Sequence, residues 1–219
     1  MGIEKGKQRC GDMYVKIKDA EENSFVDKFD VERLIRNGYG EILNVSADSI
    51  DRNRIEQVLT NNSAIKSAQV YVGLDGSFHV DITQRRPILR VVSGEKSYYI
   101  DEDGSIMPLS RKYTARVVVA VGKISDRFAT SVLYPFVVSL KEDELWNSYV
   151  EQIVVNSEDD IRLVPKVGNF TILMGGLENS GNKLDKLRLF LKKGTEQKGW
   201  NTYKEINLKF EKQIVCVRK

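Results

Sequence analysis

The sequence has little of what most catalytic and metal sites are built from. It contains one histidine, His79, and two cysteines, Cys10 and Cys216, in 219 residues. No spacing of cysteine or histidine fits a structural zinc site, and a nucleophilic triad that needs histidine has little to draw on. We therefore expect no catalytic residue, no metal and no cofactor, and we place His79 on the solvent face of a strand. We expect both cysteines to be unpaired, with a bridge between the two chain ends as the alternative.

A charge excess and a long apolar run are missing as well. The 34 basic and 31 acidic residues leave a net charge of +3, which argues against a dedicated nucleic-acid binder because such proteins concentrate positive charge. No apolar run reaches the length of a membrane-crossing helix, and residues 1–12 lack the apolar stretch of a signal peptide. These absences fit either a cytoplasmic protein or the part of a membrane protein that follows its membrane segment.

The composition is that of a soluble, globular protein, with 41% apolar and 30% charged residues, and the length allows one large domain or two ordinary ones. Residues 13–93 have the order strand, helix, helix, strand, strand. Alternating apolar residues indicate strands at 13–19 and on both sides of the turn sequence GLDG, and helical spacing indicates helices at 29–38 and 51–62. This order predicts a small α+β module with both helices on one face of a three-stranded sheet.

Polar residues near the start of each helix predict how the helices begin. Asp30 is expected to cap the first helix. Asn53, with Glu56 three residues later, is expected to form a capping box at the second.

Residues 94–219 predict a larger, mainly antiparallel β domain with helices. A hairpin is expected at 97–110 and a buried strand at 116–122. Helical structure is expected at 125–146, where Pro135 either kinks the helix or opens a second one. Three successive antiparallel strands, a helix and a final strand follow.

Two kinds of segment in this region could hold a ligand. The acidic clusters at 101–104, 141–144 and 157–160 lack the ligand spacing of a calcium loop and fall where turns are expected. The glycine-rich segment at 173–184 fits neither phosphate-binding glycine pattern, so we interpret it as a strand-to-helix connection.

The end of the chain reads as one long strand over 206–217. At about 3.3 Å per residue it would be roughly 40 Å long, so we expect a bulge or turn at 211–213. A terminal strand at a sheet edge leaves backbone groups unpaired, which is a liability unless another strand pairs with it.

Several segments together resemble a known family. The segments RIEQVLTNNSAIKSAQVYV and ITQRRPILRV resemble a POTRA domain and the segment that closes it. SYYIDEDGSIMPLS, GNKLDKLRLFL and YKEINLKFEKQIVCVR are similar to the β domain that follows it. Over residues 13–219 the chain resembles the extracytoplasmic region of the FtsQ/DivIB family of bacterial cell-division proteins.

The resemblance implies a non-catalytic divisome assembly protein. It implies a POTRA-like domain at 13–93, an FtsQ-type β domain at 94–219, and a segment 1–12 that follows a membrane anchor. The implied location is the periplasmic side of the cytoplasmic membrane at the division site, with a single-pass anchor. The implied partners are FtsB, FtsL and the septal synthase complex, with no nucleic acid.

The family's β domain receives FtsB as an added strand near its C-terminal edge. We expect Phe210 to be the anchor and Lys209 to attract an acidic partner segment, while the alternative is that Phe210 and Leu208 face this domain's own core. Arg85 and Arg86 are expected either to contact another protein from the POTRA-like domain or to be solvated charges. The full set of expected partner-binding residues at the edge is Asn207, Lys209, Phe210, Glu211, Val215 and Val217.

Two alternative functions predict other features of the sequence. A POTRA-containing component of outer-membrane protein assembly or secretion would predict repeated POTRA units, and the sequence has one. An enzyme would predict converging ionisable groups in the second region, and no nucleophile, base and orienting group can be named.

Overall fold

The computed structural model describes residues 9–198 and 202–219. The chain forms two compact units. The first extends to Arg86 and also includes Ser110–Ala115, whereas the second consists of Pro87–Leu109 and Arg116–Lys219. Each unit has its own sheet and its own core, so each is described by itself.

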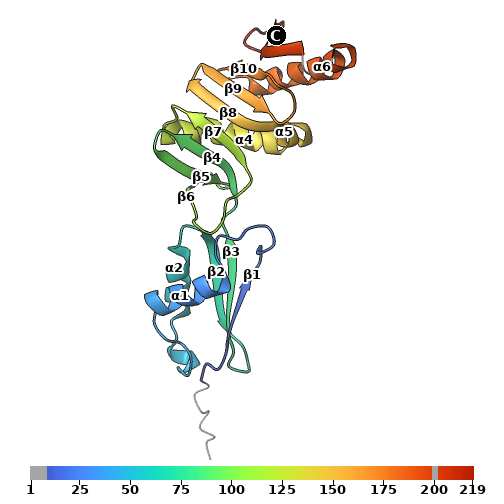
Figure 1. The fold of residues 1–219 in the computed structure, drawn as a ribbon. Helices are drawn as coiled ribbons and strands as arrows, with labels where there is room; N and C mark the ends of the chain where they lie inside the picture. The colour runs from blue at the N-terminus through green and yellow to red at the C-terminus, as the bar shows by residue number, and fades with distance from the viewer. Residues whose placement is uncertain (1–8, 199–201) are drawn as a thin grey trace, which may run out of the picture. The chain divides into compact units, whose positions relative to one another are not determined.

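The first unit is a three-stranded sheet with two helices on one face (Figure 1). The strand order is β1-β3-β2, with β1 parallel and β2 antiparallel to β3. This confirms the predicted α+β module. The elements are β1 (Met13–Ile17), α1 (Lys28–Gly38), a 3-10 turn (Ala47–Ser49), α2 (Arg52–Thr60), β2 (Ile65–Val72) and β3 (Phe78–Gln84).

Both helices begin earlier in the chain than their predicted caps. Asp27 caps α1 by accepting from the N–H of Asp30 at 2.8 Å, and Asp30 returns the bond by accepting from the N–H of Asp27 at 3.1 Å. Asp51 caps α2 by accepting from Arg54 N–H. The predicted cap at Asp30 is therefore wrong by one turn, because Asp30 is the third helical residue of a capping box.

The predicted capping box of α2 is also wrong. Asp51 already occupies the capping position, so Asn53 lies inside the first turn. Glu56 instead reaches β2, where its Oε1 accepts from the N–H of Val70 at 2.8 Å.

The second unit is built on a nine-stranded mixed sheet of order β12-β11-β10-β9-β8-β7-β4-β5-β6. Three pairings are parallel, β4–β7, β7–β8 and β10–β11, and the other five are antiparallel. The predicted mainly antiparallel α+β domain is confirmed. The strands are β4 (Pro87–Ser93), β5 (Lys96–Asp101), β6 (Ile106–Pro108), β7 (Val118–Gly122), β8 (Val150–Ser157), β9 (Asp160–Pro165), β10 (Thr171–Gly175), β11 (Tyr203–Asn207) and β12 (Val215–Arg218).

Helices cover one face of this sheet (Figure 1). Their apolar residues, such as Leu140 and Leu187, join the inward side chains of the strands in a single core. Burial of that apolar area is the main force holding the two layers together. The helices are α3 (Asp126–Phe128), α4 (Tyr134–Lys141), α5 (Glu144–Tyr149) and α6 (Ser180–Lys198), and a π-helical segment (Ala129–Leu133) joins α3 to α4.

Pro135 explains the π-helical segment. Proline has no N–H and its ring crowds the preceding turn, so a regular α-helix cannot run through it. The chain widens just before Pro135, where Tyr134 N–H bonds to Ala129 O, five residues back. Ser131 Oγ donates to Arg127 O at 2.6 Å in the same stretch. The two alternatives expected from the sequence therefore merge into one helical run with a local π-turn.

The division between the units falls at the start of β4. Pro87–Ser93 pairs with β5 and β7 of the second sheet, so the first unit ends at Arg86. The boundary expected at residue 93 lies seven residues further along, at the end of β4. The apolar alternation of β3 ends at Ile82, and the short polar segment before the apolar run of β4 does not show that the two strands belong to different sheets.

Candidate partner-binding edge

The chain ends in a β-hairpin at the edge of the nine-stranded sheet. β12 pairs antiparallel with β11, and β11 pairs parallel with β10. Within residues 9–198 and 202–219, no other strand pairs with β12. The outer side of β12 therefore has the open backbone groups of an edge strand.

The segment 206–217 is not one continuous strand, which confirms the interruption expected from its length. The chain leaves the sheet after Asn207 and returns at Val215. Leu208 is fully buried and its N–H donates to Leu173 O at 2.9 Å, while Asn207 Oδ1 accepts from Lys209 N–H at 3.0 Å. These two bonds turn the chain, so the break spans 208–214 and is wider than the turn expected at 211–213.

The side chains of β12 alternate between the core and the solvent. Cys216 is half-buried against the core, and this burial raises the pKa of its thiol. Val215 and Val217 lie on the opposite face with 40% and 46% of their surfaces exposed. The edge strand thus presents two apolar side chains two residues apart beside its open backbone.

Phe210 lies in the turn of the hairpin and not on a strand. Its surface is 47% exposed, so of the two residues in the alternative interpretation only Leu208 faces the core. Lys186 Nζ, on α6, donates to the carbonyl oxygen of Phe210 at 2.5 Å. This contact holds the turn close to the helix. Glu211 follows Phe210 in the turn and is exposed.

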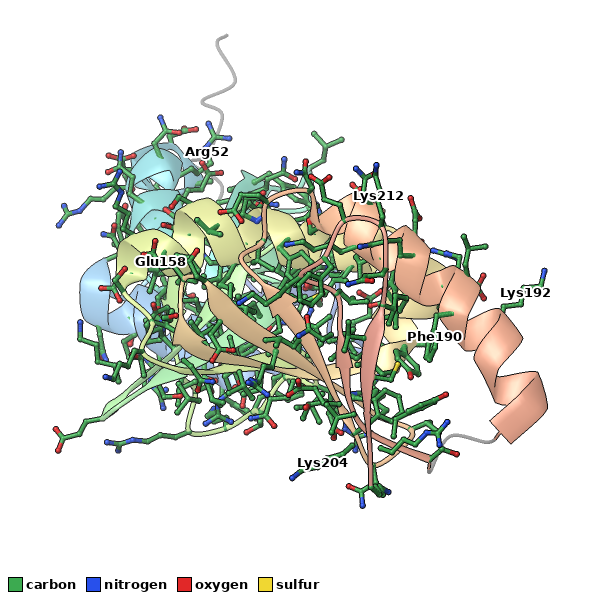
Figure 2. All side chains as sticks on the ribbon, turned by 90° about the horizontal axis from the view of Figure 1, so that it is seen from above. Arg52, Glu158, Phe190, Lys192, Lys204 and Lys212 are labelled. Atoms are coloured by element: carbon green, nitrogen blue, oxygen red, sulfur yellow. The ribbon has the colours of Figure 1, made fainter. Side chains whose placement is uncertain are left out.

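A hollow of about 680 Å³ separates the start of α6 from the hairpin turn. Its lining includes Lys183, Lys209 and Glu211. Burial is the main cause that lowers the pKa of Lys183, whose Nζ donates to Gly176 O at 2.7 Å. Figure 2 shows Lys212 near the turn of the hairpin and Lys204 near its open end.

An ion pair beneath this edge was not predicted from the sequence. Arg162 Nη1 on β9 donates to Glu205 Oε2 on β11 at 2.6 Å, and Arg162 Nε donates to Asp160 Oδ1 at 3.1 Å. Arg162 and Glu205 are 43 residues apart. Only the alternation of β9 and β11 could have indicated that they share a face of the sheet.

The two arginines expected at the end of the POTRA-like domain lie between β3 and β4. Arg85 N–H donates to Ala64 O at 2.9 Å. Arg86 pairs with Glu22 at 3.0 Å and with the buried Asp19 at 3.6 Å. Arg86 therefore fastens the loop between β1 and α1, and its contact with another protein stays a prediction.

Two family comparisons cover most of the chain. Residues 86–217 match the family model described as FtsQ/DivIB, C-terminal related. Residues 8–83 match the model of a POTRA-like domain. No curated protein matches the chain. In the part of the chain that is described, no helix combines the length and the apolar character needed to cross a membrane.

Proposed function

This chain belongs to the FtsQ/DivIB C-terminal related family, and from this premise we propose that it is an extracytoplasmic assembly module of the bacterial divisome. The family serves cell division as a non-catalytic scaffold. In this proposal a single-pass anchor precedes the described residues and holds them at the division site. The module binds FtsB- and FtsL-type partners and links them to septal peptidoglycan synthesis.

The observation that carries the proposal is the position of β12. It is the outermost strand of its sheet, and Val215 and Val217 are exposed beside it. An extended partner segment gains affinity from the edge's backbone groups and specificity from the side chains at alternating positions. An FtsB-type strand is proposed to pair with β12 and to place apolar side chains against the two valines.

The hairpin turn places an aromatic ring and basic residues at one end of this edge. Phe210 is half-exposed, and Lys209 and Lys212 lie close to it in the sequence. The ring can anchor an apolar part of the partner segment, and the two lysines can attract acidic residues beside that part. In such a contact the ring supplies most of the binding energy and the charges speed the encounter. Asn207 lies opposite Val215 at the end of β11, where it marks the end of the proposed strand pairing.

The test is to titrate the chain with an FtsB-type peptide and to measure the affinity by isothermal titration calorimetry. The double variant Val215→Glu/Val217→Glu is expected to weaken binding by at least about tenfold, because it places two charges against an apolar strand. Val167→Glu is the matched control, since Val167 is 58% exposed in the turn between β9 and β10. Equal affinities of the two variants would refute docking at β12.

The role of Phe210 is tested separately. Phe210→Ala, in a protein whose thermal unfolding is unchanged, is expected to weaken binding by about tenfold or more. Unchanged affinity would remove Phe210 from the site while leaving strand addition at β12 in place.

A further inference from the structure

The sheet of the first unit also has two edges, and they differ in how their backbone groups are used. The strand order β1-β3-β2 places β1 and β2 on the outside (Figure 1). Each edge strand bonds to β3 with every second residue and turns the N–H and C=O groups of the others outward.

The β2 edge is blocked at its middle. Gly73 N–H donates to Ser77 O at 2.8 Å, which fixes the odd-numbered residues of β2 as those that bond to β3. The N–H of Val70 therefore faces outward, and it donates to Glu56 Oε1 at 2.8 Å. A carboxylate from α2 thus occupies the bond that an added strand would need.

The β1 edge is open. Asp12 O accepts from Phe78 N–H at 2.8 Å, and Lys18 N–H donates to Ile82 O at 2.9 Å. In a parallel ladder these two bonds assign the even-numbered residues of β1 to β3. The outward N–H and C=O groups then belong to Met13, Val15 and Ile17. Across the described residues no strand pairs with this side of β1.

The side chains beside this edge are an aromatic ring and an exposed cation. Tyr14 is 54% exposed and stacks on His79 with 5.3 Å between ring centroids, and His79 stacks on Tyr71 at 4.9 Å. Tyr14 is thus the outer end of a row of three rings, one from each strand. Lys16, two residues along β1, is exposed and is in no ion pair among the described residues.

We propose that the β1 edge binds an extended peptide segment of a partner protein that carries an aromatic residue and, two positions away, Asp or Glu. The peptide exchanges backbone hydrogen bonds with Met13, Val15 and Ile17. Its aromatic ring lies across from Tyr14 and adds a fourth ring to the row, and its carboxylate lies across from Lys16.

Neighbouring charges fix how such a peptide aligns. Asp12 precedes Tyr14 on the same face and repels an acidic residue on that side of the ring. Lys18 is already engaged, since its Nζ is 3.8 Å from Asp81 Oδ2 and donates to Gln69 Oε1 at 3.3 Å. The acidic residue therefore belongs opposite Lys16, so the order of the aromatic and acidic residues along the peptide decides whether it pairs parallel or antiparallel to β1.

The test uses the full chain and a nine-residue peptide in which Phe and Glu are two positions apart. Binding is followed by backbone amide shifts in NMR spectra. The expected result is saturable shifts of Met13, Val15 and Ile17. Val15→Pro removes an outward N–H that the fold does not use, which an edge strand tolerates, and is expected to weaken binding by about tenfold.

The matched control is Val72→Pro, which removes an outward N–H from the opposite edge and should leave the affinity unchanged. Lys16→Glu is expected to weaken binding by about fivefold, and this variant carries the test if Val15→Pro fails to fold. Undiminished binding by folded Val15→Pro or Lys16→Glu protein would overturn the proposal, as would shifts confined to β2. The valine variants of β12 should bind this peptide normally, so the outcome is independent of the function proposed for β12.

Discussion

Arg162 and Glu205 lie on strands that are not neighbours, and their side chains meet across the strand between them. Arg162 Nη1 on β9 is 2.6 Å from Glu205 Oε2 on β11, while β10 separates the two strands. The Arg162 and Glu205 side chains are only 29% and 23% exposed. β10 and β11 pair through only three residues each. This ion pair therefore adds a second interaction that holds the terminal hairpin to the rest of the sheet.

Loss of this fastening should loosen the hairpin that we propose as the partner site. Glu205→Gln keeps the shape of the side chain but removes its charge. It is expected to lower the free energy of local opening of β11 and β12 by about 1 kcal/mol, since a partly buried hydrogen bond between charged groups is lost. Hydrogen–deuterium exchange of the β11 and β12 amides measures this opening.

Lys204→Gln is the control for that measurement. Lys204 is the exposed neighbour of Glu205 and is in no ion pair within the described part of the chain. Equally fast exchange in both variants would show that the ion pair does not hold the hairpin.

Gly122 is predicted to be the least replaceable glycine of the second unit. Its φ is +132°, and a Cβ atom there would lie 1.9 Å from Val155 O on the neighbouring strand. Gly122→Ala is expected to destabilise the protein by more than about 2 kcal/mol, because both the backbone conformation and the close strand pairing must change. Urea denaturation followed by tryptophan fluorescence measures the effect.

Gly181→Ala provides the comparison. Gly181 lies in the first turn of α6, and nothing is within 4 Å of the position that a Cβ atom would occupy. Alanine there is expected to stabilise the protein by up to about 1 kcal/mol. Similar destabilisation by the two substitutions would contradict the close approach of Gly122 to β8.

The order of elements in the first unit could be predicted because its signals are local. Alternation and helical spacing over 13–84 reflect half-buried elements, and each covers one continuous stretch of sequence. The predicted caps are wrong because several polar residues lie near the start of each helix. Asp27 and Asp30 are equally suitable by residue type, and only the backbone conformation selects Asp27 as the cap.

The strand partners in the second unit could not be predicted in the same way. β4, β7 and β8 are parallel neighbours, yet long segments separate them in the chain. An apolar run such as that of β7 shows burial but not which strand lies beside it. The same limit applies to the terminal hairpin. The alternation of apolar residues continues to Phe210, but β11 ends at Asn207 and the next N–H, that of Leu208, bonds to Leu173 O.

Gln84 is predicted to be essential for the first unit although it is a polar residue. It is fully buried, its Nε2 donates to Asn23 O at 2.7 Å, and its Oε1 accepts from Val26 N–H at 2.9 Å. Gln84→Ala leaves both backbone groups without a partner and is expected to cost about 2–3 kcal/mol. Thermal unfolding measured by circular dichroism tests this, with the exposed Gln57→Ala as control. A Gln84→Ala effect no larger than that of Gln57→Ala would show that water replaces the amide.

The first unit should also lose stability in acid through Asp27. Lys112 Nζ, in the segment 110–115, bonds to Asp27 Oδ2 at 2.9 Å and to Asp30 Oδ2 at 2.5 Å. The bond from Lys112 is the main cause that lowers the pKa of Asp27, and the bond from the backbone of Asp30 is the second. A carboxyl group whose pKa is lower in the folded state stabilises the fold above its ordinary pKa, and this stabilisation disappears as the pH falls through the folded value.

Lys112→Met removes that main cause while keeping the length of the side chain. Above about pH 4 the variant is expected to be less stable than the parent protein, and the difference should shrink as Asp27 becomes protonated at lower pH. Urea unfolding followed by the NMR amide signals of α1 at a series of pH values measures this difference. Arg52→Gln removes a positive charge from an exposed position on α2 (Figure 2) without touching Asp27, so its effect should not follow the same pH dependence. A Lys112→Met effect that stays constant down to the lowest pH would mean that packing of the lysine stem, and not its bond to Asp27, stabilises this unit.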